Sequence, residues 1–308
     1  MTAFAIETKQ LSFSFHQGRK VVNELSLQVP QKSIYGFLGP NGAGKTTTIR
    51  LLTGMLLSNS DNIYINGQSL QKTIPKIFQS IGTLIETPSL YLHLTAKENL
   101  RIIVTMRGLT SKRIGEVLEI VGLGNVGDRK VKEYSLGMKQ RLGIAMALLP
   151  DPELLILDEP ANGLDPSGII HVRELLKRLN MEFGKTVFIS SHLLSEIEKT
   201  CTHIAIIHKG VLRYQGSLQE MKTAAYASGE VIFKIAEAND WLPDLQKQFP
   251  QMKQFAHDEI LFSFADQKEV AMINQQLVNK QIPVCGIQIK GGLEDWFMRI
   301  TQNDPGIV

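Results

Sequence analysis

The sequence contains few cysteines and no apolar run long enough to cross a membrane. Its two cysteines, Cys201 and Cys285, lie far apart among the 308 residues and form neither a disulfide framework nor a metal-binding spacing. No segment approaches about 18 consecutive apolar residues, and the N-terminus lacks the basic and apolar regions of a secretion signal. We therefore expect a soluble, cytosolic chain whose thiols stay free in a reducing compartment.

The charged residues are nearly balanced, which argues against a nucleic-acid-binding protein. Lys and Arg number 33 against 30 Asp and Glu, so the formal net charge is +3, and no Lys/Arg-rich block stands out. Nucleic-acid-binding proteins usually concentrate basic residues in one stretch or on one face, so we expect no nucleic acid partner. The 43% of hydrophobic residues are enough for a buried core. The length suggests two domains, or one large domain with an appendage.

The most informative segment is GPNGAGKTT, residues 39–47, which fits the pattern G-x-x-x-x-G-K-[ST]. An apolar run, 33–38, precedes it and a helical pattern, 46–55, follows it, whereas a glycine-rich turn with an incidental lysine would need neither. Glycines let the backbone wrap closely around an anion, so that N–H groups and the positive end of the helix face the phosphates. Lys45 would contact the β- and γ-phosphates, and the Thr46 hydroxyl would bind Mg²⁺. The pattern predicts a nucleoside-triphosphate site formed by Gly39, Pro40, Asn41, Gly42, Ala43, Gly44, Lys45, Thr46 and Thr47.

Polar residues also follow two apolar segments further along the chain. Residues 154–157, Leu-Leu-Ile-Leu, predict a buried strand that ends at Asp158 and Glu159, and open α/β sheets place their chemistry at such strand ends. Downstream of a phosphate-binding loop, Asp158 is expected to hold Mg²⁺ and Glu159 is a candidate general base. A second predicted strand, 186–191, ends just before His192. Taken alone, His192 fits a structural histidine better than a catalytic one.

Two strand patterns precede the phosphate-binding segment, at residues 4–15 and 21–29. Phe15 stands at the end of the first of them. Its ring could stack on a purine base, or it could join the core together with Leu11 and Phe13, which share its parity. The strand pattern alone leaves both alternatives open.

A long helical segment follows a further strand pattern at 77–85. Residues 95–150 are helical throughout and begin with a capping box, Thr-Ala-Lys-Glu at 95–98, which satisfies free N–H groups of the first turn. Ser135 is a natural N-cap for the last helix of this segment. The pattern predicts a helical insert between segments of the sheet.

Taken in this order and spacing, the motifs resemble the nucleotide-binding subunit of an ATP-binding cassette (ABC) transporter over roughly residues 4–221. Residues 135–140, Ser-Leu-Gly-Met-Lys-Gln, are similar to the family signature L-S-G-G-Q. They depart from it in several places, with Tyr134 for the leucine and Leu136 for the first glycine. The resemblance therefore rests on several separate motifs, of which the phosphate-binding loop is intact.

The resemblance implies a role for each of the polar residues. Asp158 would hold Mg²⁺ together with Thr46, Glu159 would be the catalytic base, and His192 would hold the γ-phosphate. Two copies of the chain would enclose two ATP molecules, because the signature of one copy covers the γ-phosphate bound by the other. The implied cofactors are therefore ATP and Mg²⁺. The further nucleotide contacts that the resemblance implies are Phe15, Ser135, Gly137, Gln140 and Asp165.

One departure from the family pattern concerns a metal-site residue. The family's Q-loop glutamine falls at Glu86, where the resemblance implies a catalytic role and contact with Mg²⁺ and the attacking water. A glutamate here resembles the subgroup that exports bacitracin and lantibiotic peptides, and the chain length and the segment 292–296 fit that subgroup too. The alternative is a solvated surface glutamate with no role.

We therefore expect an α/β fold of the P-loop NTPase class, with an ABC ATPase core and a small C-terminal α/β appendage. The core would span residues 1–221, with a helical subdomain at about 95–150, and the accessory domain would span 222–308. Its strand and helix pattern is of ferredoxin-like character. The strands are expected at 231–235, 260–264 and 284–289, and the helices near 239–248, 267–280 and 293–301.

The expected partners are a second ATPase subunit, in a homodimer, and a separate integral membrane permease. The permease would hold the chain at the inner face of the cell membrane and could dock near residues 90–92, unless Leu90 and Leu92 simply join the core. A soluble ABC-type ATPase with a non-transport role is the alternative, but neither a coiled-coil insert nor a second cassette is present. A GTPase would need Asn-Lys-x-Asp, whereas 279–282 ends in Ile. A regulatory module without activity would have lost Lys45 or the acids after 154–157.

Overall fold

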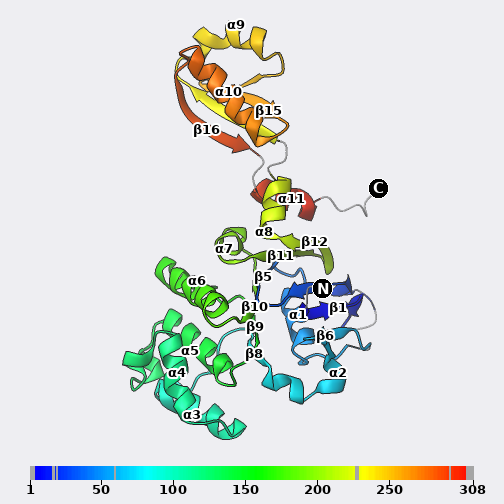
Figure 1. The fold of residues 1–308 in the computed structure, drawn as a ribbon, viewed down its shortest axis with the longest axis vertical. Helices are drawn as coiled ribbons and strands as arrows, with labels where there is room; N and C mark the ends of the chain where they lie inside the picture. Colours follow the sequence, from blue (N-terminus) through cyan, green and yellow to red (C-terminus); the bar gives the residue numbers. More distant parts are fainter. Residues whose placement is uncertain are drawn as a thin grey trace. The chain divides into compact units, whose positions relative to one another are not determined.

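The computed structural model describes residues 4–15, 18, 20–58, 60–225, 229–290 and 293–302. It divides into two compact units, Met1–Leu218 and Gln219–Val308, which we call the core unit and the C-terminal unit (Figure 1). Within the described ranges, no helix is long and apolar enough to cross a membrane.

The central sheet of the core unit consists of β5 (Ile34–Leu38), β8 (Ile81–Leu84), β9 (Leu154–Leu157), β10 (Thr186–Ser191), β11 (His203–His208) and β12 (Val211–Ser217). Their order is β12-β11-β5-β10-β9-β8, and every pair is parallel except β11 with β12. All residues of β5, β9 and β10 are buried. Continuous apolar runs of this kind suit a parallel sheet that is covered on both faces.

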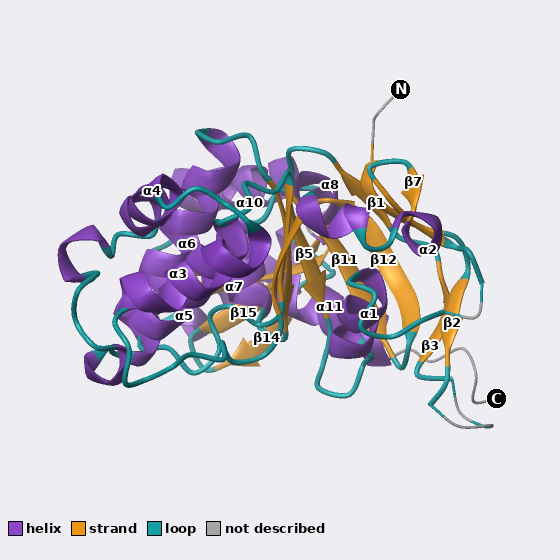
Figure 2. Cartoon of the chain, turned by 90° about the horizontal axis from the view of Figure 1, so that it is seen from below, coloured by secondary structure: helices purple, strands orange, loops and turns teal. Residues whose placement is uncertain are grey.

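The helices on one side of this sheet are α3 (Ala96–Arg107), α4 (Lys112–Ile120), α5 (Leu136–Leu148), α6 (Pro166–Met181) and α7 (Leu194–Thr200) (Figures 1 and 2). The predicted capping box begins α3, since Thr95 Oγ1 accepts from the Glu98 N–H and Glu98 Oε2 accepts from the Thr95 N–H. The predicted N-cap of α5 is present as well, because Ser135 Oγ accepts from the Met138 N–H. Local sequence signals therefore set where these helices start.

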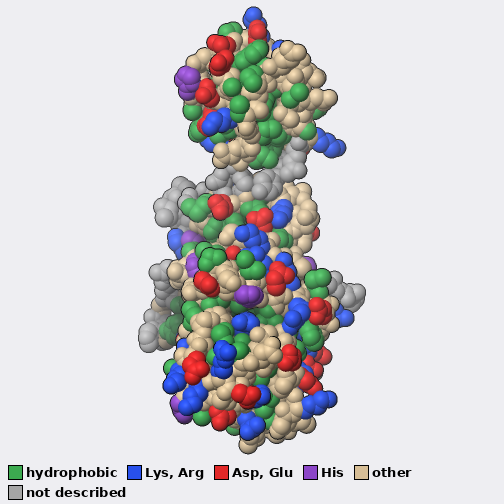
Figure 3. Space-filling view, turned by 90° about the vertical axis from the view of Figure 1, so that its left-hand side faces the viewer, with side chains coloured by type: hydrophobic (Ala, Val, Ile, Leu, Met, Phe, Trp, Pro, Cys, Tyr) green, Lys and Arg blue, Asp and Glu red, His purple; other side chains and the backbone are tan. Residues whose placement is uncertain are grey.

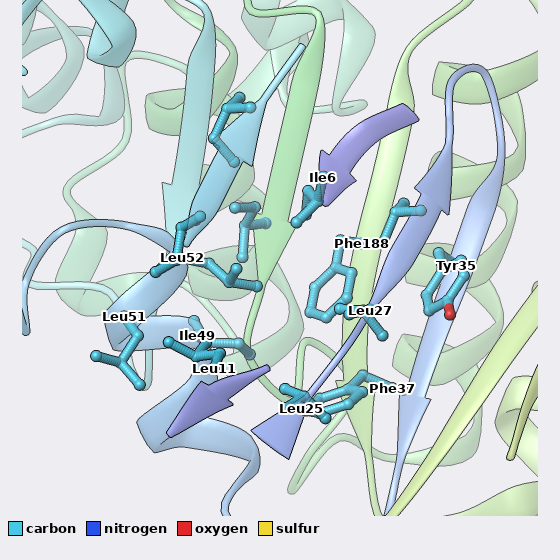
Figure 4. Packing of buried hydrophobic residues seen from close by; sticks show 14 of the residues in the cluster. Ile6, Leu11, Leu25, Leu27, Tyr35, Phe37, Ile49, Leu51, Leu52 and Phe188 are labelled. Atoms are coloured by element: carbon cyan, nitrogen blue, oxygen red, sulfur yellow. The ribbon is translucent and has the colours of Figure 1, made fainter. Parts of the chain in front are cut away.

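The other side of the sheet carries α1 (Lys45–Leu52), α2 (Leu70–Thr73) and a layer of antiparallel strands (Figure 2). The strands are β1 (Phe4–Thr8), β2 (Leu11–Phe13), β3 (Val22–Leu25), β4 (Gln28–Pro30), β6 (Ile63–Ile65) and β7 (Gln68–Ser69). A large core cluster lies between the two layers (Figure 4). The central sheet contributes Phe37 and Phe188, α1 contributes Ile49, and the antiparallel layer contributes Ile6 and Leu27. Each such side chain stabilises the fold by about 1.5 to 3 kcal/mol through burial, so this cluster holds α1 against the sheet.

Four boundaries differ from the sequence-based expectation. The single strand expected at 21–29 is two strands, β3 and β4, which belong to different sheets, and Glu24 has a left-handed φ of 52°. Residues 4–15 form two strands, because Gln10 adopts a left-handed φ of 50° between them. The strand expected at 77–85 begins later, because Lys76–Gln79 is a 3-10 helix. Helix α1 ends before Met55, which is 64% exposed and does not extend the buried stripe. In each case the pattern of apolar residues continues in the sequence where the backbone changes conformation. The pattern alone therefore does not show where the element ends.

The β11–β12 hairpin is absent from the elements expected from the sequence. Its two turn residues, Lys209 and Gly210, both have positive φ, at 49° and 80°, as in the tight turns that suit the twist of a hairpin. The Gly210 N–H donates to the carbonyl of Ala43 at 2.9 Å, so this turn supports the phosphate-binding loop. In the sequence, the Lys-Gly pair between two apolar runs was the signal that could have predicted this hairpin.

The C-terminal unit contains β13 (Gly229–Ile235), α9 (Ala238–Gln248), β14 (Lys253–Ala256), β15 (Glu259–Phe264), α10 (Gln267–Asn279) and β16 (Val284–Lys290), with α8 (Leu218–Ala225) and α11 (Leu293–Gln302) flanking them. The sheet order is β14-β15-β13-β16 and all pairs are antiparallel. This β-α-β-β-α-β arrangement has the predicted ferredoxin-like character. Strand β14 was missed because all four of its residues are exposed and show no apolar alternation.

Charged side chains of both signs intermix on the face of the molecule seen in Figure 3. No large field of one sign covers that face. This distribution agrees with the small net charge of +3.

Candidate nucleotide-binding site

The segment predicted to bind phosphate forms the loop between β5 and the start of α1. Gly39 is required there, because a Cβ atom on it would lie 2.4 Å from the Ile207 carbonyl oxygen. Gly44 has a φ of 106°, and a Cβ on it would lie 2.8 Å from the Val21 carbonyl oxygen. The glycines therefore let the loop pack tightly between neighbouring backbones while its N–H groups and the N-terminus of α1 remain at the strand end.

Lys45 spans this loop with a side chain that is only 6% exposed. Its Nζ donates to the carbonyls of Gly39 at 2.8 Å and Pro40 at 3.3 Å. The same Nζ lies 3.3 Å from Oε1 of Glu159. A buried ammonium is therefore held at the loop by two carbonyls and one carboxylate.

Asp158 and Thr46 provide adjacent oxygen atoms beside the loop. Thr46 Oγ1 donates to Asp158 Oδ2 at 2.8 Å, and Ser190 Oγ donates to Asp158 Oδ1. Asp158 is 3% exposed, and its backbone N–H donates to the Leu84 carbonyl at 2.8 Å, which ties it to the end of β8. A carboxylate and a hydroxyl are the hard oxygen donors that Mg²⁺ prefers. Within the part of the chain that the structure describes, no group of three His, Cys, Asp or Glu could hold a metal by itself. These two donors fit a Mg²⁺ that takes its other ligands from phosphate and water.

Glu159 lies between two basic side chains. Its Oε1 faces Lys45 Nζ, and its Oε2 lies 2.8 Å from His192 Nδ1. Glu159 also has a φ of 48°, a left-handed backbone conformation that is uncommon for a residue other than glycine. Such strained residues occur preferentially at functional sites. The carboxylate is thus aimed into the loop region by contacts on both of its oxygens.

Ser190 was not predicted from the sequence, although it connects the two acids. Its hydroxyl is 0% exposed, donates to the Asp158 carboxylate and accepts from the Glu159 N–H at 2.8 Å. Ser190 is the penultimate residue of β10, which lies between β5 and β9. The sequence offered only a hydroxyl residue near the end of the apolar strand 186–191 as a signal.

Phe15 lies outside the buried core. It follows β2 rather than ending it, and 53% of the residue is exposed. Its ring packs edge-on against Phe13, with centroids 5.1 Å apart. The core alternative left open by the strand pattern is therefore wrong, and stacking on a base stays a prediction.

Glu86 is not in direct contact with the cluster of Lys45, Asp158 and Glu159. Its side chain is 60% exposed and forms an ion pair with Nη2 of Arg50 on α1. Its backbone φ of 63° is left-handed. It stands two residues beyond Leu84, whose carbonyl accepts from the Asp158 N–H, so the chain leaves the sheet beside Asp158.

Residues 22–162 match the family model described as ABC transporter. Over 298 residues the chain is 42% identical to the bacitracin transport ATP-binding protein BcrA of Bacillus licheniformis. This match covers 96% of each of the two chains. It belongs to the ABC transporter ATP-binding family. As a member of this family the chain binds ATP and hydrolyses it, and the predicted resemblance is confirmed.

This ABC ATPase is also similar in sequence to a lantibiotic transport protein and in fold to a solved ABC transporter subunit. The chain is 43% identical over 203 residues to the lantibiotic transport ATP-binding protein SrtF of Streptococcus pyogenes, covering 65% of this chain and 87% of that one. The solved structure of cbiO1 from Clostridium perfringens, part of the ABC transporter complex cbiONQ, matches with a TM-score of 0.66 at 23% identity. That match covers 81% of this chain and 97% of the other, and it confirms the predicted fold class.

The signature of this ABC ATPase lies apart from its own phosphate-binding loop. Ser135 and Gly137 are at the start of α5, and α5 and α1 lie on opposite sides of the central sheet (Figures 1 and 2). Asp165 caps α6, where its Oδ1 accepts from the Gly168 N–H at 2.9 Å. Ser135 is exposed, whereas Gln140 is only 7% exposed. The buried Gln140 side chain therefore offers little surface to a nucleotide on another copy.

The structure thus brings part of the predicted site together. The loop, Thr46, Lys45, Asp158, Glu159 and His192 form one connected cluster. The remaining predicted residues lie outside it in a single chain, and the roles of both groups stay predictions. They are Phe15, Glu86, Ser135, Gly137, Gln140 and Asp165.

Proposed function

We propose that this ABC ATPase powers the export of antimicrobial peptides of the bacitracin and lantibiotic type through a separate membrane permease. The observation that carries the proposal is the match to the bacitracin transport protein BcrA, which spans 96% of each chain and therefore includes the C-terminal unit. The match to the lantibiotic transport protein SrtF covers 203 residues, fewer than the core unit contains. The C-terminal unit is therefore a feature shared with the bacitracin relative.

The proposed chemistry begins with the phosphates of ATP at the loop. The loop N–H groups and Lys45 Nζ bind the phosphates, which replace the Glu159 carboxylate as the partner of the ammonium. Thr46 and Asp158 would hold Mg²⁺, which when bound neutralises phosphate charge. Glu159, still oriented by His192, then accepts a proton from the water that attacks the γ-phosphorus. The bond from that phosphorus to the bridging oxygen breaks, and ADP leaves with this electron pair.

A second copy of the chain would complete the site. The position of α5 across the sheet from α1 supports this proposal, because Ser135 and Gly137 belong to the start of α5 and the loop leads into α1 (Figures 1 and 2). In a dimer they would cover the γ-phosphate bound by the partner, together with Asp165. Donors placed there would stabilise the charge on the transferred phosphoryl group.

The proposed docking surface for the permease is the apolar segment at residues 90–92. Tyr91 is 54% exposed and Leu92 is 49% exposed, while Leu90 is half-buried. Asn99, which is 2% exposed, fixes this segment because its side chain bonds both the N–H and the carbonyl of Tyr91. A rigid, exposed apolar segment just beyond Glu86 suits contact with a permease helix. The permease would then hold the chain at the inner face of the cell membrane.

Copurification and resistance test this proposal together. The tagged chain is purified from membranes of its host, and we expect one multi-span protein to be retained with it. Cells that express the chain with that protein should tolerate more bacitracin or lantibiotic than cells with the Glu159→Gln variant. Equal tolerance for the two, with both chains present at the membrane, would contradict peptide export.

A further inference from the structure

The ion pair between Arg50 and Glu86 has a specific position relative to the metal-site residues. We propose that Arg50 is a positioning residue that holds the Glu86 carboxylate in the nucleotide-free chain and competes with Mg²⁺ for it. This inference rests on the proposed function, because it requires a Mg²⁺-dependent nucleotide site. It assigns to Arg50 a role in setting how much Mg²⁺ the ATPase needs.

Helix geometry places Arg50 next to the metal-site hydroxyl. Arg50 and Thr46 are four residues apart on α1, so their side chains lie on the same face, with Cβ atoms about 5–6 Å apart. Side chains on a helix lean towards its N-terminus, so the Arg50 side chain is directed towards the turn that carries Thr46. Thr46 donates to Asp158 at 2.8 Å. Arg50 is therefore one helical turn from Thr46, one of the two residues whose oxygens fit Mg²⁺.

Strand β8 of the central sheet brings Glu86 close to Arg50. The Leu84 carbonyl, at the end of β8, accepts from the Asp158 N–H at 2.8 Å. Glu86 follows two residues later, and its Oε1 reaches Nη2 of Arg50. Glu86 thus follows the strand end that is bonded to Asp158, and its exposed side chain has room to rotate away from Arg50.

The environment of Glu86 leaves the ion pair as the contact that fixes its carboxylate. The Glu86 side chain is 60% exposed, so packing does not restrain its carboxylate. Asp158, by contrast, is fixed by donors from Thr46 and Ser190. Asp158 and Glu159 are largely buried and are held by several contacts. Glu86 is exposed, and the ion pair with Arg50 is the contact that holds its carboxylate.

The charge count gives the direction of the effect. A triphosphate with Asp158 and Glu159 already concentrates negative charge, and Glu86 adds one more when it is not paired. Arg50 neutralises that charge while the metal is absent. Once Mg²⁺ is present, Arg50 and the cation compete for the same carboxylate. Removing Arg50 should therefore make Glu86 more available to the metal and lower the Mg²⁺ requirement.

The test compares Arg50→Gln, Glu86→Gln and the double variant with the wild-type chain. The readout is binding of a fluorescent ATP analogue as Mg²⁺ is titrated, with the ATPase rate as a second measurement. We expect R50Q to lower the half-saturating Mg²⁺ concentration about two- to fivefold, the range of an exposed ion pair. In the E86Q background the same substitution should have no effect, and R50K should retain the wild-type value.

A matched control is Lys97→Gln, which removes a cation from the exposed pair with Asp128 on the same unit. It should leave the Mg²⁺ requirement unchanged, and thermal denaturation of each variant checks folding. An unchanged or raised requirement in R50Q would overturn the inference, as would an equal shift in the E86Q background, because Arg50 would then act on the nucleotide directly. If the wild-type chain binds and hydrolyses no ATP even at saturating Mg²⁺, the proposed function fails as well, whereas normal binding with no difference between R50Q and wild type overturns the inference alone.

Discussion

Replacing Glu159 by Gln should change ATP affinity and turnover in opposite directions. Oε1 of Glu159 lies 3.3 Å from Lys45 Nζ, and both side chains are largely buried. At an effective dielectric constant of about 20, the attraction at this distance is about 5 kcal/mol, of which desolvation of the two charges offsets a large part. We take the net contribution as about 1 to 2 kcal/mol. Phosphate must displace this carboxylate from Lys45, so the neutral amide should tighten ATP binding about five- to thirtyfold.

Turnover should fall in the same variant because an amide cannot accept the proton of the attacking water. General base catalysis contributes about 10²- to 10⁴-fold, so we expect at least a hundredfold loss of the hydrolysis rate. Isothermal calorimetry measures the affinity and phosphate release measures the rate. Glu182→Gln, at the residue that follows α6, is the control for charge. Wild-type turnover would mean that Glu159 is only a structural acid. Unchanged affinity would mean that the Lys45 contact does not oppose ATP binding.

Three further substitutions test other parts of the site and the chain. Lys45→Ala should weaken ATP binding about a hundredfold in calorimetry, because the phosphates lose a buried charged donor, and equal affinity would remove the phosphate-binding argument. Glu86→Gln should bind ATP without Mg²⁺ more tightly than wild type and need more Mg²⁺ for half-maximal hydrolysis; superimposable titrations would leave Glu86 without a role. Burial raises the pKa of the Cys201 thiol, so a maleimide at neutral pH should label only the exposed Cys285 in the native chain, and labelling of a Cys285→Ser variant would contradict this.

Elements that depend on neighbouring residues could be predicted from the sequence. The capping box at Thr95, the N-cap at Ser135 and the apolar strand before Asp158 all formed where the pattern indicates. Each is specified by residues within a few positions of one another, and such local signals survive in the folded chain. The strand β14 carries no comparable signal, because all its residues are exposed and its pairing comes from the neighbouring strand β15.

Contacts that join distant parts of the chain could not be predicted in the same way. Ser190 bridges Asp158 and Glu159 because β9 and β10 are neighbours in the sheet, and nothing near position 190 in the sequence indicates that pairing. The same holds for the pairing of Arg50 with Glu86. An arginine on a surface of a helix and a glutamate in a loop are unremarkable until the fold sets them beside each other.

The two ion pairs of α1, Lys45 with Glu159 and Arg50 with Glu86, are arranged in the same way. Lys45 and Arg50 lie on one helix, and each is paired with a carboxylate that follows the end of a strand, Glu159 after β9 and Glu86 after β8. Because β8 and β9 are adjacent, the two acids reach the same helix from the same edge of the sheet. Within the chain, the site therefore neutralises its own cations with the acids that hydrolysis is proposed to use. A ligand of low charge has little power to separate these pairs, whereas a triphosphate with its metal offers both the anion for Lys45 and the cation for Glu86. On this argument nucleotide binding and the release of the catalytic acids are one event.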